Sequence, residues 1–329
     1  MSSFIIRGII SVKSNYIHFT VNNGNSQANH LLLRSIWRCK MFREFNLKEV
    51  TGKGQDKGII IGYHWSVEAA EKVVVIIHGI GEYAGRYDRL ANIFNEKNIA
   101  VLSMDLRGHG KSFGKRGHTA PRQEILKDID DLIIYALEAY PGVPLILYGH
   151  SMGGNMVLDY RIRGLLANRP SAFVVTAPWV RLVKPLSKPL GLAALVLSKL
   201  GPSTTFESKI DSSVLGNPKS VGEYKKDPLV HGKISAETAQ DGFTTARMLE
   251  EVKLQGDFNG KGKPILLIHG KEDKLCSIQG TRAIAKNDDA KLMTYLELEG
   301  IYHEVHNGGI DSDGTEVILR IRDFVASID

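Results

Sequence analysis

The sequence predicts an α/β fold in which helices flank a mostly parallel central sheet. Six short apolar runs, rich in leucine or β-branched residues, have the length of buried parallel strands; they span 73–77, 100–104, 145–148, 172–175, 265–268 and 292–296. After Pro121, apolar residues recur every three or four positions from Ile125 to Tyr140, which predicts an amphipathic helix. Strands that alternate with helices in this way form one sheet with helices on both faces.

The core of this fold is expected at 44–177 and 236–329. It opens with two strands, at 45–50 and 58–65, which a glycine-rich turn at 52–56 joins into a hairpin. The rest of each half follows the alternation of strands and helices. No fixed-period repeat interrupts it, so a repeat architecture is not predicted.

The stretch between the two halves, 178–235, breaks the alternation. It contains prolines and an apolar helical segment at 190–200, but no pattern typical of a sheet strand. Because it follows the strand that ends at Ala177, we expect a helical cap, or lid, over the carboxyl edge of the sheet, where ligands bind in open α/β folds. Four apolar residues of the helical segment either line an acyl pocket or pack the cap onto the core: Leu192, Leu195, Val196 and Leu197.

Composition indicates an ordinary globular protein, since 43% of the 329 residues are apolar and 24% are charged. The formal net charge is +6, from 42 Lys and Arg against 36 Asp and Glu, but six basic residues and no acid lie within 1–43. The other 286 residues carry 36 charges of each sign, so no basic groove for nucleic acid is expected. We interpret 1–43 as a basic, poorly ordered N-terminal extension, either dispensable or a targeting segment, with Met41 as an alternative start.

Cysteine and hydropathy patterns set further expectations. Cys39 and Cys276 are too few for a disulfide framework, and no C-x-x-C or H-E-x-x-H spacing predicts a metal site. We therefore expect no metal, no cofactor and a reducing compartment. No window of 18 apolar residues predicts a membrane-spanning helix, and the first residues lack the pattern of a secretory signal. A cytoplasmic protein is expected; its oligomeric state is not predicted.

The candidate nucleophile is Ser151, in the motif G-x-S-x-G formed by residues 149–153. The apolar run before the motif predicts a strand, and the residues after it predict a helix. A serine on such a sharp turn exposes its hydroxyl above the sheet, and Gly149 and Gly153 are needed because side chains there would meet neighbouring backbone. The position therefore predicts nucleophilic catalysis.

A serine hydroxyl needs a general base and an acid that orients the base. In folds with this turn the acid and then the histidine follow the serine along the chain, on loops after later strands. Asp273 follows the strand at 265–268, and His303 follows the strand at 292–296. We therefore predict Asp273 as the acid and His303 as the base, with Glu272 and His306 as the nearest alternatives.

The oxyanion of the reaction requires backbone N–H donors. One is expected from Met152, directly after the serine, and the other from Ile80, in the glycine-rich loop after the strand at 73–77. His78 and His150 precede turns at strand ends, where we expect them to make supporting hydrogen bonds. Asp105 opens another loop and is interpreted as an acid that holds this loop in place.

Several separated motifs together resemble the monoacylglycerol lipases of the α/β-hydrolase fold. They are HGIGEYAGRY at 78–87, DLRGHGKS at 105–112, GHSMGG at 149–154 and YHEVH at 302–306. The cap adds IDSSVL at 210–215 and YKKDPL at 224–229, and the acid loop adds EDKLC at 272–276. The resemblance runs from about Phe42 to the last residue.

This resemblance implies hydrolysis of a monoacylglycerol, a lipid ester, to glycerol and a fatty acid through an acyl-serine intermediate. It also implies a mobile cap that makes peripheral contact with a membrane, and a thiol-sensitive position at Cys276. Two departures are visible: Tyr83 stands where the family commonly has histidine, and the extension before residue 42 has no counterpart. By the same matching, four residues surround the glycerol end of the substrate: Glu82, Arg86, Tyr224 and His306.

Other functions stay open on the sequence alone. A lysophospholipase, a general carboxylesterase or a peptidase of the same fold would use the same catalytic groups. A catalytically silent module that binds lipid or another protein is the alternative of a different class.

Overall fold

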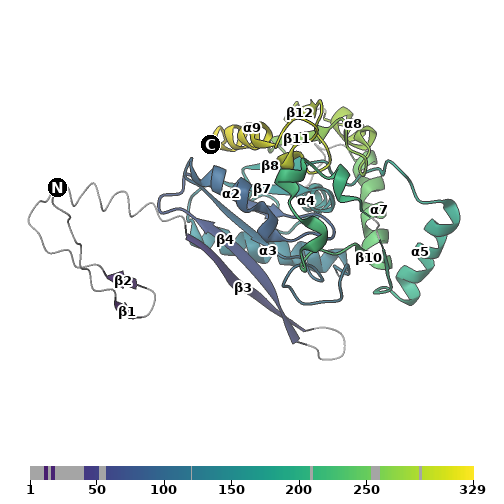
Figure 1. The fold of residues 1–329 in the computed structure, drawn as a ribbon, viewed down its shortest axis with the longest axis horizontal. Helices are drawn as coiled ribbons and strands as arrows, with labels where there is room; N and C mark the ends of the chain where they lie inside the picture. Colours follow the sequence, from purple (N-terminus) through teal and green to yellow (C-terminus); the bar gives the residue numbers. More distant parts are fainter. Residues whose placement is uncertain are drawn as a thin grey trace, which may run out of the picture. The chain divides into compact units, whose positions relative to one another are not determined.

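The computed structural model describes residues 11–13, 16–18, 41–51, 57–119, 121–207, 210–252, 260–288 and 291–329. Among these residues, eight strands form one sheet in the order β12-β11-β8-β7-β5-β6-β4-β3 (Figure 1). The strands are β3 (Met41–Thr51), β4 (Lys57–Ser66), β5 (Lys72–Ile77), β6 (Ile99–Met104), β7 (Leu145–His150), β8 (Ala172–Thr176), β11 (Ile265–Gly270) and β12 (Met293–Leu298).

The predicted mostly parallel sheet is confirmed. Strands β6, β5, β7, β8, β11 and β12 pair in parallel, whereas β3 and β4 pair antiparallel at one edge and β4 is antiparallel to β6. The predicted turn of the opening hairpin, 52–56, lies outside the described residues. Since all the parallel strands run in one direction, the loops after β5, β7, β11 and β12 emerge at a common edge, and these loops hold every predicted catalytic group.

Helices cover both faces of the sheet. Alternate residues of β5 point to opposite faces: Val73 and Val75 pack in one buried cluster with α3 and α4, and Val74 in another with α2 and α9. The helices of the core are α2 (Asp88–Asn95), α3 (Arg122–Ala139), α4 (Met152–Arg163), α7 (Ala236–Glu251), α8 (Ile278–Lys286) and α9 (Thr315–Ala326). Helix α3 directly follows Pro121, as the sequence predicts.

The stretch 178–235 adds no strand to the central sheet within its described residues. It holds α5 (Lys188–Leu200), which covers the predicted helical segment, and α6 (Pro218–Val221). It also holds β9 (Thr205–Glu207) and β10 (Lys233–Ser235), a short antiparallel pair that the sequence pattern does not reveal. Three-residue strands are too short for a recognisable alternation. Helix α5 lies beside α7 at the periphery of the core (Figure 1).

The N-terminal extension is described only at β1 (Ser11–Lys13) and β2 (Tyr16–His18), which pair antiparallel. The predictions of a targeting or poorly ordered segment otherwise fall on residues outside the described ranges, as does Cys39. Strand β3 begins at Met41, three positions before the predicted start of the core. None of the helices in the described ranges is both long and apolar enough to cross a membrane.

Candidate active site

Ser151 stands on the turn between β7 and α4 in a strained backbone conformation, with φ 55° and ψ −117°. Positive φ is uncommon for a residue with a side chain and is held here by its surroundings. The Ser151 N–H donates to the Thr176 carbonyl at 2.9 Å. A Cβ at Gly149 would lie 2.3 Å from the Gly153 carbonyl oxygen, and one at Gly153 would lie 2.0 Å from that of Ile77. The requirement for both glycines is therefore confirmed.

The structure brings Ser151, His303 and Asp273 together. His303 Nε2 lies 2.8 Å from Ser151 Oγ, and its Nδ1 lies 2.7 Å from Asp273 Oδ2. The three residues come from the loops after β7, β12 and β11, and all three are buried. This is the geometry in which a histidine takes the serine proton while a carboxylate orients the ring.

The contact between His303 and Asp273 shifts the pKa of both side chains. Burial lowers the pKa of His303, but the Coulombic and hydrogen-bond interactions with Asp273 outweigh this effect and leave the pKa above its ordinary value. Burial likewise opposes ionisation of Asp273, yet the nearby His303 and a hydrogen bond from His269 hold the pKa of this carboxyl well below its usual range. Asp273 is thus an anion at neutral pH, which favours the proton on Nδ1 of His303 and leaves Nε2 as the acceptor.

The two alternatives to this pair do not reach the serine. The Glu272 carboxylate faces Lys274, at 3.4 Å from Nζ. His306 is buried and stacks on Tyr87, with ring centroids 4.9 Å apart. Neither residue has a hydrogen bond to Ser151 or His303 within the described part of the chain.

The loop after β5, residues 78–82, lies against the serine. His78 Nδ1 lies 2.7 Å from the Gly79 carbonyl oxygen, and its Nε2 accepts from the Leu106 N–H at 3.0 Å. The Gly79 N–H donates to Glu82 Oε1. A Cβ on Gly79 would lie 3.1 Å from Ser151 Cβ, so this backbone passes directly beside the nucleophile. Ile80 follows Gly79 in this loop.

Met152, the other predicted oxyanion donor, is the first residue of α4. The first N–H groups of a helix have no acceptor within the helix, and the helix dipole adds positive charge there. The supporting role predicted for His150 agrees with a hydrogen bond of 3.1 Å between its Nδ1 and Thr176 Oγ1. The role predicted for Asp105 also agrees with the structure, because its carboxylate accepts from the Ala84 and Lys111 N–H groups.

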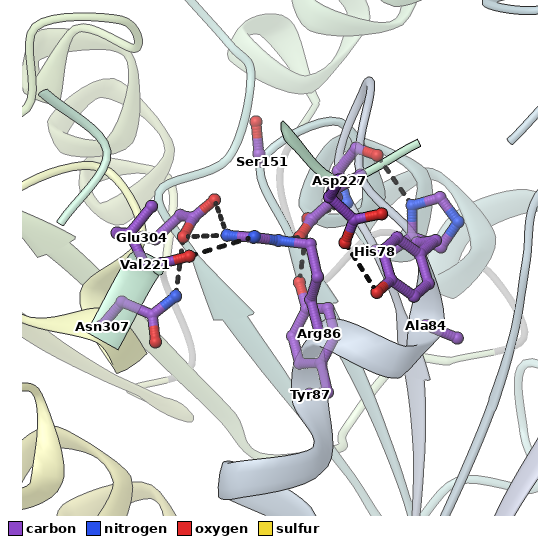
Figure 2. A network of polar contacts seen from close by, with 12 residues as sticks. His78, Ala84, Arg86, Tyr87, Ser151, Val221, Asp227, Glu304 and Asn307 are labelled. Carbon is purple, nitrogen blue, oxygen red and sulfur yellow. Dashed lines mark hydrogen bonds and ion pairs between the residues drawn. The ribbon is translucent and has the colours of Figure 1, made fainter. Parts of the chain in front are cut away.

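A buried ion cluster lies next to the catalytic groups, and Figure 2 shows the Arg86 guanidinium reaching toward the Glu304 carboxylate. Arg86 Nη2 lies 2.9 and 2.7 Å from the two Glu304 carboxylate oxygens, and Arg86 Nε lies 3.5 Å from Glu82 Oε2. The Tyr224 ring lies under the guanidinium, 4.7 Å from Arg86 Cζ. Burial and the neighbouring Glu304 raise the pKa of Glu82. Arg86 lowers that of Glu304 against the effect of burial.

Several polar atoms of this cluster lack a hydrogen-bond partner among the described residues. They are Glu82 Oε2, Arg86 Nε and both ring nitrogens of His306. Burial lowers the pKa of His306 to about 4, so the ring is neutral at pH 7 with one donor and one acceptor. Glu82 Oε2 and Arg86 Nε face each other as an ion pair at 3.5 Å, so the ring nitrogens of His306 are the atoms of this set that a ligand could satisfy.

Sequence reasoning missed three polar residues of this region. Glu304 pairs with Arg86, and Asp227 accepts a hydrogen bond of 2.8 Å from the Tyr83 hydroxyl. The place of Glu304, directly after the predicted base, was a usable signal. His269, at the end of β11, contacts Asp273 at 3.1 Å. Its proximity to Asp273 along the chain could also have drawn attention to it.

Residues 68–309 match the model of a family described as serine aminopeptidase, S33. The chain belongs to this family. Members of the family are serine hydrolases, so the predicted class of enzyme is confirmed.

The chain is also similar in sequence to individual proteins. It is 36% identical over 239 residues to an uncharacterized abhydrolase domain-containing protein of Dictyostelium discoideum, covering 71% of this chain but only 24% of that protein. It is 35% identical over 239 residues to a monoacylglycerol lipase of Mycolicibacterium smegmatis, covering 71% of this chain and 82% of the relative. The predicted resemblance to monoacylglycerol lipases is thereby confirmed.

A solved structure agrees on the fold. The crystal structure of a monoacylglycerol lipase from Paleococcus ferrophilus superposes with a TM-score of 0.72 at 29% identity, covering 82% of this chain and 99% of that chain. The α/β-hydrolase fold predicted for this family member is therefore confirmed.

Proposed function

We propose that the protein hydrolyses monoacylglycerols to glycerol and a free fatty acid, with Ser151 as nucleophile. One observation carries the proposal: His303 bridges Ser151 Oγ and Asp273 Oδ2 with distances of 2.8 and 2.7 Å. Similarity to monoacylglycerol lipases supports the choice of substrate.

In the acylation step, Ser151 Oγ attacks the ester carbonyl while His303 Nε2 takes the hydroxyl proton. Asp273 stabilises the imidazolium that forms and keeps the ring oriented. The oxyanion accepts hydrogen bonds from the Ile80 and Met152 N–H groups, and the tetrahedral intermediate collapses as His303 protonates the departing glycerol oxygen. The products of this step are glycerol and an ester of the fatty acid with Ser151.

Deacylation repeats the sequence with water as the nucleophile. His303 takes a proton from water, hydroxide adds to the acyl carbonyl, and the proton returns to Ser151 Oγ as the fatty acid leaves. The raised pKa of His303 makes its protonated form a competent acid for both leaving groups near neutral pH.

The glycerol end of the substrate is assigned to the cluster around Arg86. Glu82, Arg86, Tyr224 and His306 lie together there, and the unpartnered nitrogens of His306 can accept from one hydroxyl and donate to another. A cavity of about 400 Å³ is lined by Arg86 and Tyr224 together with five cap residues, and its lining does not include Glu82, His306 or the catalytic groups. The polar groups gathered around Arg86 suit the hydroxyls of a small polyol.

We also propose that 178–235 is a cap that contacts a membrane, between core segments 44–177 and 236–329 and after the extension 1–43. On α5, Leu192 is 63% and Val196 is 47% exposed, and Leu195 is exposed as well. An apolar helix face of this kind suits the interface of a bilayer.

Replacing Leu192 and Val196 by Ser should weaken sedimentation with phospholipid vesicles, whereas Leu165→Ser, at a residue 75% exposed on the core, should not. Equal sedimentation of both variants would argue against the cap as the contact. The cytoplasmic location stays a prediction.

The deciding experiment compares kcat/KM on four substrates: a monoacylglycerol, a lysophospholipid, a short aryl ester and an aminoacyl amide. The proposal expects the highest value for the monoacylglycerol. Preference for the lysophospholipid or the aryl ester would favour a lysophospholipase or a general carboxylesterase, and preference for the amide would favour a peptidase. No hydrolysis of any of them by folded protein would favour a silent binding module.

A further inference from the structure

Asp273 Oδ2 faces two histidines. His303 Nδ1 lies 2.7 Å away, as the proposed mechanism requires, and His269 Nε2 lies 3.1 Å away on the other side. His269 comes from β11, is fully buried and has no part in the reaction described above.

The contacts of His269 determine which nitrogen carries its proton. Nε2 lies 3.1 Å from Asp273 Oδ2 and 3.1 Å from the Cys276 carbonyl oxygen. Both atoms only accept hydrogen bonds, so Nε2 must be the donor. Nδ1 lies 2.7 Å from the Thr281 hydroxyl of α8, which can donate to it. A proton on Nε2 and a Thr281 hydroxyl that donates to Nδ1 together satisfy all three partners.

The other oxygen of Asp273 is held by backbone. Oδ1 accepts from the Leu275 N–H at 2.8 Å and from the Cys276 N–H at 2.9 Å. The carboxylate is thus anchored on one oxygen, while the other is shared between His303 and His269. Through the Cys276 carbonyl, His269 also holds the loop that carries the acid.

The backbone brings the loop of the base close to the end of β11. A Cβ at Gly270 would lie 2.3 Å from the Ile301 carbonyl oxygen, so only glycine permits this approach. His269 is one residue earlier in the same strand and contacts Asp273 Oδ2 at 3.1 Å.

We propose that His269 is a positioning residue for the catalytic acid: it donates a hydrogen bond from Nε2 to Asp273 Oδ2 and keeps that oxygen directed at His303. This inference rests on the proposed function, because it assumes that Asp273 and His303 act on Ser151. A hydrogen bond to an anion is among the stronger ones in proteins. It draws charge from the oxygen that His303 uses, and so moderates the proton affinity of His303.

Other ionisable groups also act on the two partners and stay in place when His269 is changed. Asp273 is additionally faced by His150 and by the Cys276 thiol. His303 is faced by His150, His306, Glu82 and Glu304.

The test compares His269→Leu, which removes the donor, with His269→Gln, whose amide can still donate to Asp273. The readouts are the pH profile of kcat/KM on an aryl ester and the low-field NMR resonance of the His303 Nδ1 proton. In the wild type the acid limb should have its midpoint above the ordinary histidine pKa of about 6.5. In His269→Leu we expect a fall in kcat/KM of about tenfold, a midpoint at higher pH and a shifted resonance. His269→Gln should restore all three toward wild type.

A purely structural role would lower the activity of both variants without moving the midpoint or the resonance, and that result would overturn the inference. If His269→Leu does not fold, Thr281→Val replaces it. Loss of the hydroxyl that donates to His269 Nδ1 should move the midpoint of the pH profile in the same direction by a smaller amount. An unchanged midpoint would contradict the inference. Failure of the proposed catalytic groups is distinct, because wild-type protein would then not hydrolyse the aryl ester before any substitution is made.

Discussion

The two buried polar clusters around Ser151 differ in how completely they are hydrogen bonded. In the cluster of Ser151, His303 and Asp273, both carboxylate oxygens and both ring nitrogens have partners. In the cluster of Glu82, Arg86 and His306, polar atoms of all three side chains lack hydrogen-bond partners among the described residues. The first cluster has its hydrogen bonds without a ligand, whereas in the second both ring nitrogens of His306 lack one.

This difference separates two tasks. Proton transfer needs groups that already hold the geometry of the reaction, because reorganisation would add to the barrier. Recognition of a polyol needs donors and acceptors that a ligand can satisfy, and these cost stability while the site is empty. Substitutions in the first cluster should therefore mainly change kcat, and those in the second should mainly change KM and stability.

The largest effect is expected from Ser151→Ala. Removal of the nucleophile should lower kcat on a monoacylglycerol by on the order of 10⁵- to 10⁶-fold, as in other hydrolases with a serine triad. Substrate binding should persist, because the second cluster is unchanged. Steady-state kinetics and equilibrium binding measure the two effects. Retained turnover would mean that another residue is the nucleophile.

Arg86→Met should be the most destabilising change in the second cluster. It leaves two buried carboxylates, Glu82 and Glu304, without their shared cation, a loss that costs about 3–5 kcal/mol in buried pairs. Arg86 lowers the pKa of Glu304, so its stabilising effect is present at neutral pH and is lost as acid protonates that carboxylate. Denaturant unfolding should therefore show a larger difference between wild type and Arg86→Met at pH 7 than at pH 3, which lies below the usual glutamate pKa of about 4.3.

The control for this prediction is Arg86→Met combined with Glu304→Gln. Removing one of the two stranded charges should recover part of the lost free energy of unfolding. If the double variant is no more stable than Arg86→Met, repulsion between buried carboxylates is not the cause.

His306→Leu should affect recognition more than catalysis. The change removes both unpartnered ring nitrogens and keeps a side chain of similar volume. Loss of one or two hydrogen bonds to glycerol corresponds to roughly five- to thirtyfold in KM. The methyl ester of the same fatty acid has no glycerol and serves as the control substrate. An equal rise in KM on both esters would show that His306 does not bind the glycerol end of the substrate.

The smallest effect is expected from Tyr83→Phe. The variant loses only the hydrogen bond from the Tyr83 hydroxyl to Asp227, a half-exposed contact worth about 0.5–1.5 kcal/mol. Because Asp227 ends the turn that carries Tyr224, we expect up to about a tenfold rise in KM with kcat unchanged. Tyr83→His, which restores a donor, should reverse the change. If Tyr83→His does not restore KM, the hydrogen bond to Asp227 is not the cause of the change.

Much of the fold was predictable because its signals are local. The buried strands are continuous apolar runs, α3 has its apolar residues at helical spacing, and the turn at Ser151 is marked by two glycines with no room for a Cβ. Chain order then narrows the choice of acid and base, since loops after parallel strands meet at one edge of the sheet.

Contacts between distant positions were not predictable in this way. Arg86 and Glu304 are 218 positions apart, and Tyr83 and Asp227 are 144 positions apart. No periodicity or spacing connects such pairs, and a charged residue on a loop is ordinarily exposed to solvent. The proton arrangement of His269 likewise depends on which acceptors the fold places around it, and this information exists only in three dimensions.

The most direct test of the central claim is reaction with a fluorophosphonate followed by peptide mass mapping. We predict one phosphonyl adduct, on Ser151, that is absent in Ser151→Ala and forms much more slowly in His303→Ala. The rate of labelling should rise with pH along the titration of His303. An adduct on another residue, or no adduct on folded wild-type protein, would contradict the account.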